Sequence, residues 1–139
     1  MKKAIILAVL VVLLTACTAP VETAPEEAEA EESAPNTYMD VNAIEAKELI
    51  DTIPELVIID VSPNYDKGHL PGAVHYYIGD GSLDNAIPTL DKEGKYLVYC
   101  HIDSVAIRGA QKLIDAGFTT VYRLDGNYGG WVAAGYLVE

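Results

Sequence analysis

The chain is poor in cysteine, in basic residues, in phenylalanine and in tryptophan. Among 139 residues there are two cysteines, one phenylalanine and one tryptophan, and nine lysines and arginines against 21 aspartates and glutamates. Two cysteines exclude a disulfide-rich scaffold, and the formal net charge of −12 disfavours nucleic-acid binding and attraction to anionic lipids. No apolar run reaches the roughly 20 residues of a membrane-spanning helix, and the length allows one domain rather than two.

Residues 1–16 resemble a secretory signal peptide. A basic start precedes an unbroken apolar run over residues 4–14, which has the length of a signal-peptide core. The run ends in Leu14-Thr15-Ala16-Cys17, which resembles the lipobox of prokaryotic lipoproteins, a family in which the cysteine is lipidated and becomes the mature N-terminus. The resemblance predicts an exported protein, anchored through Cys17 to the outer face of the cytoplasmic membrane or elsewhere in the cell envelope. An ordinary signal peptide or an uncleaved anchor is the alternative.

The stretch up to residue 37 has the composition of a linker. Residues 19–37 contain five alanines, six glutamates and three prolines, with no aromatic and no basic residue. Such a segment buries too little apolar surface to offset its ordering entropy, so residues 17–37 are predicted to be a lipidated N-terminus and a disordered acidic tether. A helix over residues 26–32 is the weaker alternative, because like charges crowd there. Residues 38–139 are then the folded domain.

Strand-like and helical patterns alternate along the folded domain. Short continuous apolar runs predict buried strands, and apolar residues three and four apart predict helices. The expected strands are residues 56–61, 73–76, 96–99 and 119–124, and the expected helices are residues 43–51, 105–116 and 128–134. This alternation predicts an α/β domain with an open, mostly parallel central sheet and helices on both faces.

Cys100 stands where a predicted strand gives way to a predicted helix. If Cys17 carries lipid, Cys100 has no partner for an intramolecular disulfide. The unpaired amides and the dipole at a helix N-terminus favour an anion, and the same field lowers the pKa of a thiol. Cys100 is therefore a candidate nucleophile, and a small buried thiol without reactivity is the alternative.

Several motifs in this domain resemble the rhodanese-like family, in the family's order. Residues 58–61 followed by Tyr65–Ala73 are similar to its first signature, and Leu97–Cys100 resembles the strand that leads to its active cysteine. The rest of the resemblance lies in residues 116–122, 124–126 and 131–136. It covers nearly the whole folded domain and implies the rhodanese-like fold.

The resemblance also implies a single-domain sulfurtransferase. In this family a cysteine thiolate takes sulfane sulfur from a donor such as thiosulfate, becomes a persulfide, and passes the sulfur to a thiol or to cyanide. Neither a metal nor an organic cofactor is needed. Carried over by position, Cys100 is the nucleophile. The backbone amides expected to cradle the persulfide are those of His101, Ile102, Asp103, Ser104 and Val105.

The active loop departs from the family's common pattern, C-R-S-G-x-R. His101 and Val105 stand at its two arginine positions, and Asp103 stands at its glycine position. We expect Asp103 to repel anionic donors and to raise the pKa of Cys100 towards that of a free thiol. Arg108 could swing back to the loop or pair with Asp103, and a solvated residue on the helix surface is the alternative.

These departures predict an atypical sulfur donor, such as a polysulfide or a small persulfide, and weak activity on thiosulfate. A catalytically weak or inactive binding or sensing module of the same fold is the alternative. Phosphatases that share this fold need an arginine six residues after the cysteine, where this chain has Ala106, so phosphatase activity is not expected. Metal binding by Cys100, His101 and Asp103 is disfavoured, because three near-consecutive ligands rarely close a site.

Overall fold

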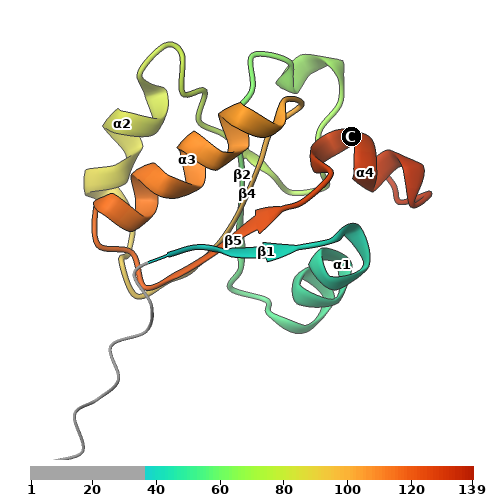
Figure 1. Ribbon diagram of the computed structural model, residues 1–139, viewed down its shortest axis with the longest axis horizontal. Coiled ribbons are helices and arrows are strands. Elements are labelled where there is room, and N and C mark those ends of the chain that lie inside the picture. The colour runs from blue at the N-terminus through green and yellow to red at the C-terminus, as the bar shows by residue number, and fades with distance from the viewer. Residues whose placement is uncertain (1–36) are drawn as a thin grey trace, which may run out of the picture. The chain divides into compact units, whose positions relative to one another are not determined.

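The computed structural model describes residues 37–139, which form an α/β fold around one five-stranded sheet (Figure 1). The strands are β1 (Met39–Val41), β2 (Val57–Asp60), β3 (Val74–His75), β4 (Lys95–Tyr99) and β5 (Thr120–Leu124). The helices are α1 (Ala43–Thr52), α2 (Ser82–Ala86), α3 (Asp103–Asp115) and α4 (Asn127–Ala133), with 3-10 turns at η1 (Tyr65–Lys67) and η2 (Ile87–Thr89). The predicted signal peptide, the lipidation of Cys17 and the predicted tether lie outside the described residues, except for Thr37. Over residues 37–139, none of the helices combines the length and the apolar character needed to cross a bilayer.

The sheet is parallel, and its inner strands β2 and β4 are buried on both faces. Its strand order is β1-β5-β4-β2-β3, and every pairing between the described strands is parallel. Ile59 and Val98 point into one apolar cluster, which includes residues of α2 and α3, whereas Ile58 and Leu97 point into a second cluster, which includes residues of α1 and α4. Figure 1 shows α2 and α3 together on one side of the sheet and α1 on the other. The predicted fold class is confirmed.

Helix α1 begins as the sequence predicts. The Asn42 side chain accepts hydrogen bonds from the amides of Ile44 and Glu45, at 2.9 and 3.0 Å, and the Glu45 carboxylate accepts one from the Asn42 amide at 2.8 Å. This reciprocal pair is a capping box, which satisfies donors that have no partner within the helix.

Three elements differ from the sequence prediction. Strand β1 was not predicted. It is only three residues long, too short for a recognisable apolar pattern, and its strand geometry comes from pairing with β5. The five-residue helix α2 is likewise too short for a periodic signal. Helix α3 begins at Asp103, two residues before the predicted start at Val105. The prediction missed these two residues because both are polar and the apolar spacing begins only at Val105.

Trp131 of α4 anchors the second apolar cluster and gives a test of the fold. Its side chain is buried, and its indole Nε1 donates a hydrogen bond to the Leu137 carbonyl at 2.8 Å. We expect Trp131→Ala to lower the free energy of unfolding by about 3–5 kcal/mol, because it removes a large buried ring and leaves a cavity. Urea denaturation of the purified domain measures this loss. The half-exposed neighbour is the control: Val132→Ala should cost less than about 1 kcal/mol, and equal losses would contradict the assignment.

Candidate active site

Cys100 lies directly after β4, at the carboxyl end of the central strand of the sheet. Its side chain is buried in the cluster beneath α3. Both of its backbone polar groups are held by the start of α4: the Cys100 amide donates to Oδ1 of Asn127 at 3.2 Å, and the Cys100 carbonyl accepts from the Tyr128 amide at 3.0 Å. The cysteine is therefore fixed at a helix–strand junction where open α/β sheets bind ligands.

The loop that follows Cys100 places backbone amides near the thiol. The backbone N–H groups of Ile102 and His101 both lower the pKa of Cys100, because they favour the thiolate. Ile102 is also the N-cap residue of α3, and no side chain caps this helix. The amide of Val105 donates to the Ile102 carbonyl at 3.1 Å, so this N–H is already engaged within the first turn. Of the residues predicted to form the cradle, His101 and Ile102 have amides that favour the thiolate, and Asp103 and Ser104 begin helix α3.

The pKa of Cys100 lies above that of an ordinary thiol. Burial raises it most, because an apolar surrounding disfavours the thiolate. The amides of Ile102 and His101 lower it, the carboxylate of Asp60 raises it and the charge of Arg108 lowers it. The sequence analysis expected a weakly activated Cys100 thiol, and the raised pKa agrees with that. The main cause, however, is burial of the thiol and not the charge of Asp103.

The Asp103 carboxylate is bound by partners that the sequence analysis did not expect. Its Oδ1 accepts a hydrogen bond from Nη1 of Arg123, on β5, and another from Nδ2 of Asn127 at 2.9 Å. Its carboxylate is not among the main causes of the shift in the pKa of Cys100. The alternative pairing of Asp103 with Arg108 is also wrong, because Asp103 is paired with Arg123. Sequence separation hid this partner, which lies 20 residues away.

The acidic residue that does act on Cys100 is Asp60, which the sequence analysis did not single out. It ends β2, whose residues pair with β4, so its carboxylate lies beside the Cys100 strand end. Asp60 is fully buried; its Oδ1 accepts from the Ser62 amide at 2.7 Å, and its Oδ2 has no hydrogen-bond partner among residues 37–139. A charged group at the end of an otherwise apolar strand was the available signal for this residue.

His101 forms part of the wall of the site. Its ring stacks on Tyr128, with centroids 4.2 Å apart and planes 14° from parallel. Its Nε2 is buried and has no hydrogen-bond partner within the described part of the chain. A Cβ atom on Gly68 would lie 2.2 Å from the Tyr128 hydroxyl, so the η1 loop closes tightly on the same side. His101 therefore lies against aromatic surface, where the family pattern would place a cationic fork.

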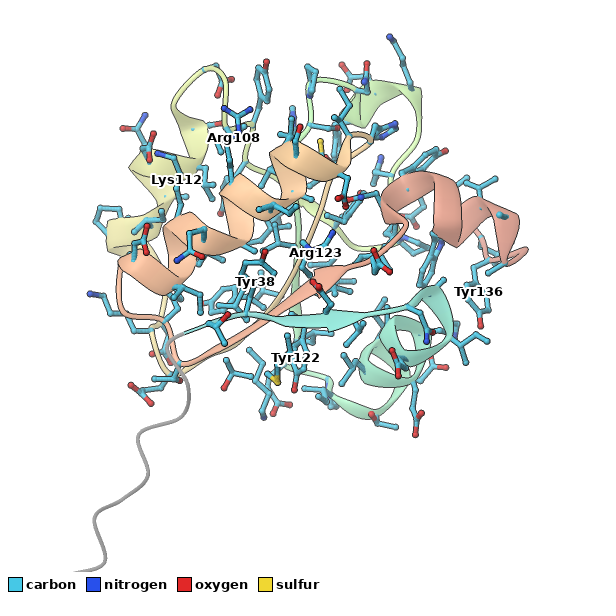
Figure 2. All side chains as sticks on the ribbon, viewed as in Figure 1. Tyr38, Arg108, Lys112, Tyr122, Arg123 and Tyr136 are labelled. Atoms are coloured by element: carbon cyan, nitrogen blue, oxygen red, sulfur yellow. The ribbon has the colours of Figure 1, made fainter. Side chains whose placement is uncertain are left out.

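Arg108 is the cation that favours the Cys100 thiolate. It is exposed on α3 and lines a surface pocket of about 350 Å³ with Ile78, Gln111, Lys112 and Asp115. Figure 2 shows Arg108 and Lys112 projecting from the side of α3 that faces α2. Lys112 pairs with Asp84 at 2.5 Å, whereas Arg108 makes no ion pair within residues 37–139. Arg108 is therefore a solvent-exposed residue of the helix surface. Its positive charge nevertheless lowers the pKa of the Cys100 thiol.

Neutralising Arg108 should therefore weaken the thiolate. We expect Arg108→Gln to lower the iodoacetamide alkylation rate of Cys100 at pH 7.5 about twofold, a modest change because the charge is exposed and screened by salt. Lys112→Gln, one turn further along α3, is the matched control and should leave the rate unchanged. Equal effects of both variants would show that only the net charge of the helix matters.

The pH dependence of alkylation tests the raised pKa directly. Because thiolate forms only as pH approaches the pKa, the rate should still be rising at about pH 8.5, where a free thiol is half ionised. The measurement is the second-order rate constant for alkylation of Cys100 by iodoacetamide, determined at intervals of about half a pH unit from about pH 6 to about pH 10. A plateau reached by about pH 7 would mean that the loop amides outweigh burial.

A family comparison agrees with this geometry. The model of the family described as "Rhodanese-like domain" matches residues 42–134, which include the whole Cys100 loop. Among curated proteins, the thiosulfate sulfurtransferase GlpE of Coxiella burnetii is 33% identical over 98 residues, covering 69% of this chain and 89% of that protein.

Solved structures give the same result. The solution structure of the rhodanese-like domain of the Alr3790 protein from Anabaena is 30% identical, with a TM-score of 0.65, and the match covers 72% of this chain and 77% of that one. A crystal structure of thiosulfate sulfurtransferase from Pseudomonas aeruginosa is 28% identical, with a TM-score of 0.63. That match covers 73% of this chain and 20% of the longer protein.

Proposed function

Because this chain belongs to the rhodanese-like domain family, we propose that it is a sulfurtransferase that carries sulfane sulfur on Cys100. The observation that carries the proposal is the setting of this thiol. Cys100 lies at the carboxyl end of the central strand, just before α3, and the backbone amides of Ile102 and His101 favour its thiolate. The same amides can stabilise the terminal sulfur anion of a persulfide.

The proposed reaction has two displacement steps. The Cys100 thiolate attacks the terminal sulfane sulfur of a donor R–S–S⁻, the bond between the two donor sulfurs breaks, and R–S⁻ leaves. Cys100 then carries a persulfide, Sγ–S⁻. In the second step an acceptor thiolate or cyanide attacks the outer sulfur, the Sγ–S bond breaks, and the Cys100 thiolate is restored. No net oxidant or reductant is consumed, because in each step the sulfane sulfur only passes from one nucleophile to another.

We further propose that the donor is a polysulfide or a small organic persulfide rather than thiosulfate. The described loop holds no arginine, which is the side chain best suited to the oxyanions of thiosulfate. Arg108 is exposed, Asp60 adds a negative charge near the thiol, and Cys100 itself is buried. A donor without oxyanion oxygens depends less on the missing arginine than thiosulfate does.

A donor panel tests the preference. With cyanide as acceptor, kcat/KM for polysulfide should exceed that for thiosulfate by at least about tenfold, the equivalent of one lost charge-assisted hydrogen bond. Thiocyanate formation gives the rates. Equal values for the two donors, or a higher value for thiosulfate, would contradict the proposed preference.

A second function, binding or sensing without appreciable turnover, is favoured by the full burial of Cys100 and by its raised pKa. Such a module would bind polysulfide or a partner protein without releasing product. The same panel separates the two: binding of polysulfide with no thiocyanate above the protein-free rate would support the module.

We also propose that the protein is exported and held in the cell envelope by lipid on Cys17. Support comes from the apolar run over residues 4–14 followed by Leu14-Thr15-Ala16-Cys17. The full chain, expressed in a bacterium, should incorporate labelled palmitate and enter the detergent phase of Triton X-114. Cys17→Ala should lose both properties. Palmitate incorporation that persists in Cys17→Ala would contradict the proposal.

A further inference from the structure

Arg123 of β5 gathers three carboxylates from separate segments. Its Nε donates to Asp40 of β1 at 2.6 Å, its Nη1 donates to Asp103 at the start of α3, and its Nη2 lies 3.6 Å from Asp125. The Arg123 side chain is only 6% exposed, whereas the Asp103 side chain is 57% exposed. The hydrogen bond that Arg123 donates to Asp40 raises the pKa of Arg123 above its usual range, so this cation is permanent and its planar fork is held by its surroundings.

Asn127 connects this ion cluster to the nucleophile. Its Nδ2 donates to Asp103 at 2.9 Å, and its Oδ1 accepts from the Cys100 amide at 3.2 Å. Asn127 is buried, and it is the one non-glycine residue with positive φ, 54°, among residues 37–139. Asparagine tolerates this conformation better than most residues, and the two hydrogen bonds hold it there. The contacts therefore run from Arg123 through Asp103 and Asn127 to Cys100.

Resting on the proposed function, we propose that Arg123 is a positioning residue of the Cys100 loop. With Asn127 it forms a clasp, the contacts Arg123–Asp103–Asn127, that holds the Asp103 carboxylate away from the Cys100 sulfur. The clasp lets a loop that carries an acidic residue keep its amides free for the anionic outer sulfur of a persulfide.

The clasp matters because Asp103 is three residues after Cys100 and exposed. Without Arg123, the Asp103 side chain can rotate about its own bonds towards the loop amides, which attract anions. A carboxylate there would compete for the donors that stabilise the thiolate, and it would raise the pKa of Cys100 by like-charge repulsion. Neutralising Asp103 should remove this effect, whereas it should not repair a loop that has simply lost its packing.

The test compares single and double variants. Arg123→Met should lower the alkylation rate of Cys100 at pH 7.5 about tenfold, which corresponds to a thiol pKa about one unit higher. The double variant Arg123→Met/Asp103→Asn should return the rate to within about twofold of the wild type. Asp103→Asn alone should also stay within about twofold, because the clasp already removes the charge from the sulfur. In the two variants that carry Asp103→Asn, the hydrogen bond from Asn127 Nδ2 can persist, because the new side chain at position 103 still has an amide oxygen to accept it.

Lys95→Met is the matched control. Lys95 pairs with Glu55 at 2.7 Å from the other end of β4, and its loss should leave the Cys100 rate unchanged. A double variant no faster than Arg123→Met alone would overturn the proposal, since Arg123 would then act only through packing. An unchanged rate in Arg123→Met would overturn it as well.

Two features keep the result interpretable. Alkylation needs a thiolate but no sulfur transfer, so a chain that fails to form a persulfide yet shows this pattern would refute the proposed function and support the clasp.

If Arg123→Met does not fold, Arg123→Lys replaces it. Lysine keeps a charge but loses the fork, so the rate should fall in part and recover with Asp103→Asn. A lysine variant whose lowered rate Asp103→Asn does not restore would overturn the clasp.

Discussion

Replacing Cys100 with serine is expected to abolish sulfur transfer from polysulfide to cyanide, with a fall in kcat of at least about 10³-fold. A serine hydroxyl is almost wholly protonated at neutral pH, and its oxygen cannot form a persulfide. The amides of Ile102 and His101 would still be present, so the variant keeps the cradle and loses only the sulfur. Steady-state thiocyanate formation measures the loss.

The chain supplies the control for this variant. Cys17→Ser removes the other cysteine and should leave the transfer rate unchanged. The buried position of Cys100 makes it necessary to show that Cys100→Ser is folded, and its unfolding free energy should lie within about 2 kcal/mol of the wild type. A folded Cys100→Ser protein that keeps more than a tenth of the wild-type rate would place the chemistry elsewhere.

Introducing an arginine at position 105 is expected to raise kcat/KM for thiosulfate about tenfold or more. Val105 is in the first turn of α3 and contacts the apolar cluster that contains Cys100. A guanidinium there can donate to the sulfonate oxygens of thiosulfate, and a hydrogen bond between charged groups contributes about 1.5–3 kcal/mol. Val105→Arg should therefore reverse the donor preference in part, as kcat/KM for polysulfide and thiosulfate will show.

The companion variant Asp103→Gly distinguishes two explanations of weak thiosulfate activity. Because Asp103 is paired with Arg123 and Asn127, its removal alone should change kcat/KM for thiosulfate less than about threefold. If Asp103→Gly instead gives the larger gain, the carboxylate acts on the donor and the missing arginine is secondary. No gain from Val105→Arg would contradict the role given to the arginine position.

Local sequence patterns were enough to predict the α/β fold and the position of Cys100 between a strand and a helix. The apolar runs that became β2 and β4 are continuous because these strands are buried on both faces. Cys100 follows such a run and precedes a helical spacing, which places it at a strand–helix junction in any α/β arrangement. By contrast, β1 has no such run, since its geometry depends on β5.

The electrostatics of the site depend on contacts that no local pattern reveals. From the sequence, Asp103 is expected to be a negative charge close to Cys100. In the structure, Arg123 of β5 pairs with the Asp103 carboxylate. Asp60 reads as the polar end of a strand, yet parallel pairing of β2 with β4 brings it close enough to raise the pKa of the thiol. The charge that matters is therefore set by strand order and side-chain direction.

The most direct test of the central claim is the intact mass of the purified domain after incubation with polysulfide and removal of excess donor. Cys100 as a sulfur carrier predicts a mass increase equal to one sulfur atom, located on the Cys100 peptide, lost on adding cyanide and absent in Cys100→Ser. An unchanged mass under conditions in which Cys100 is alkylated by iodoacetamide would contradict the account, because a reactive thiol would then be present without accepting sulfur.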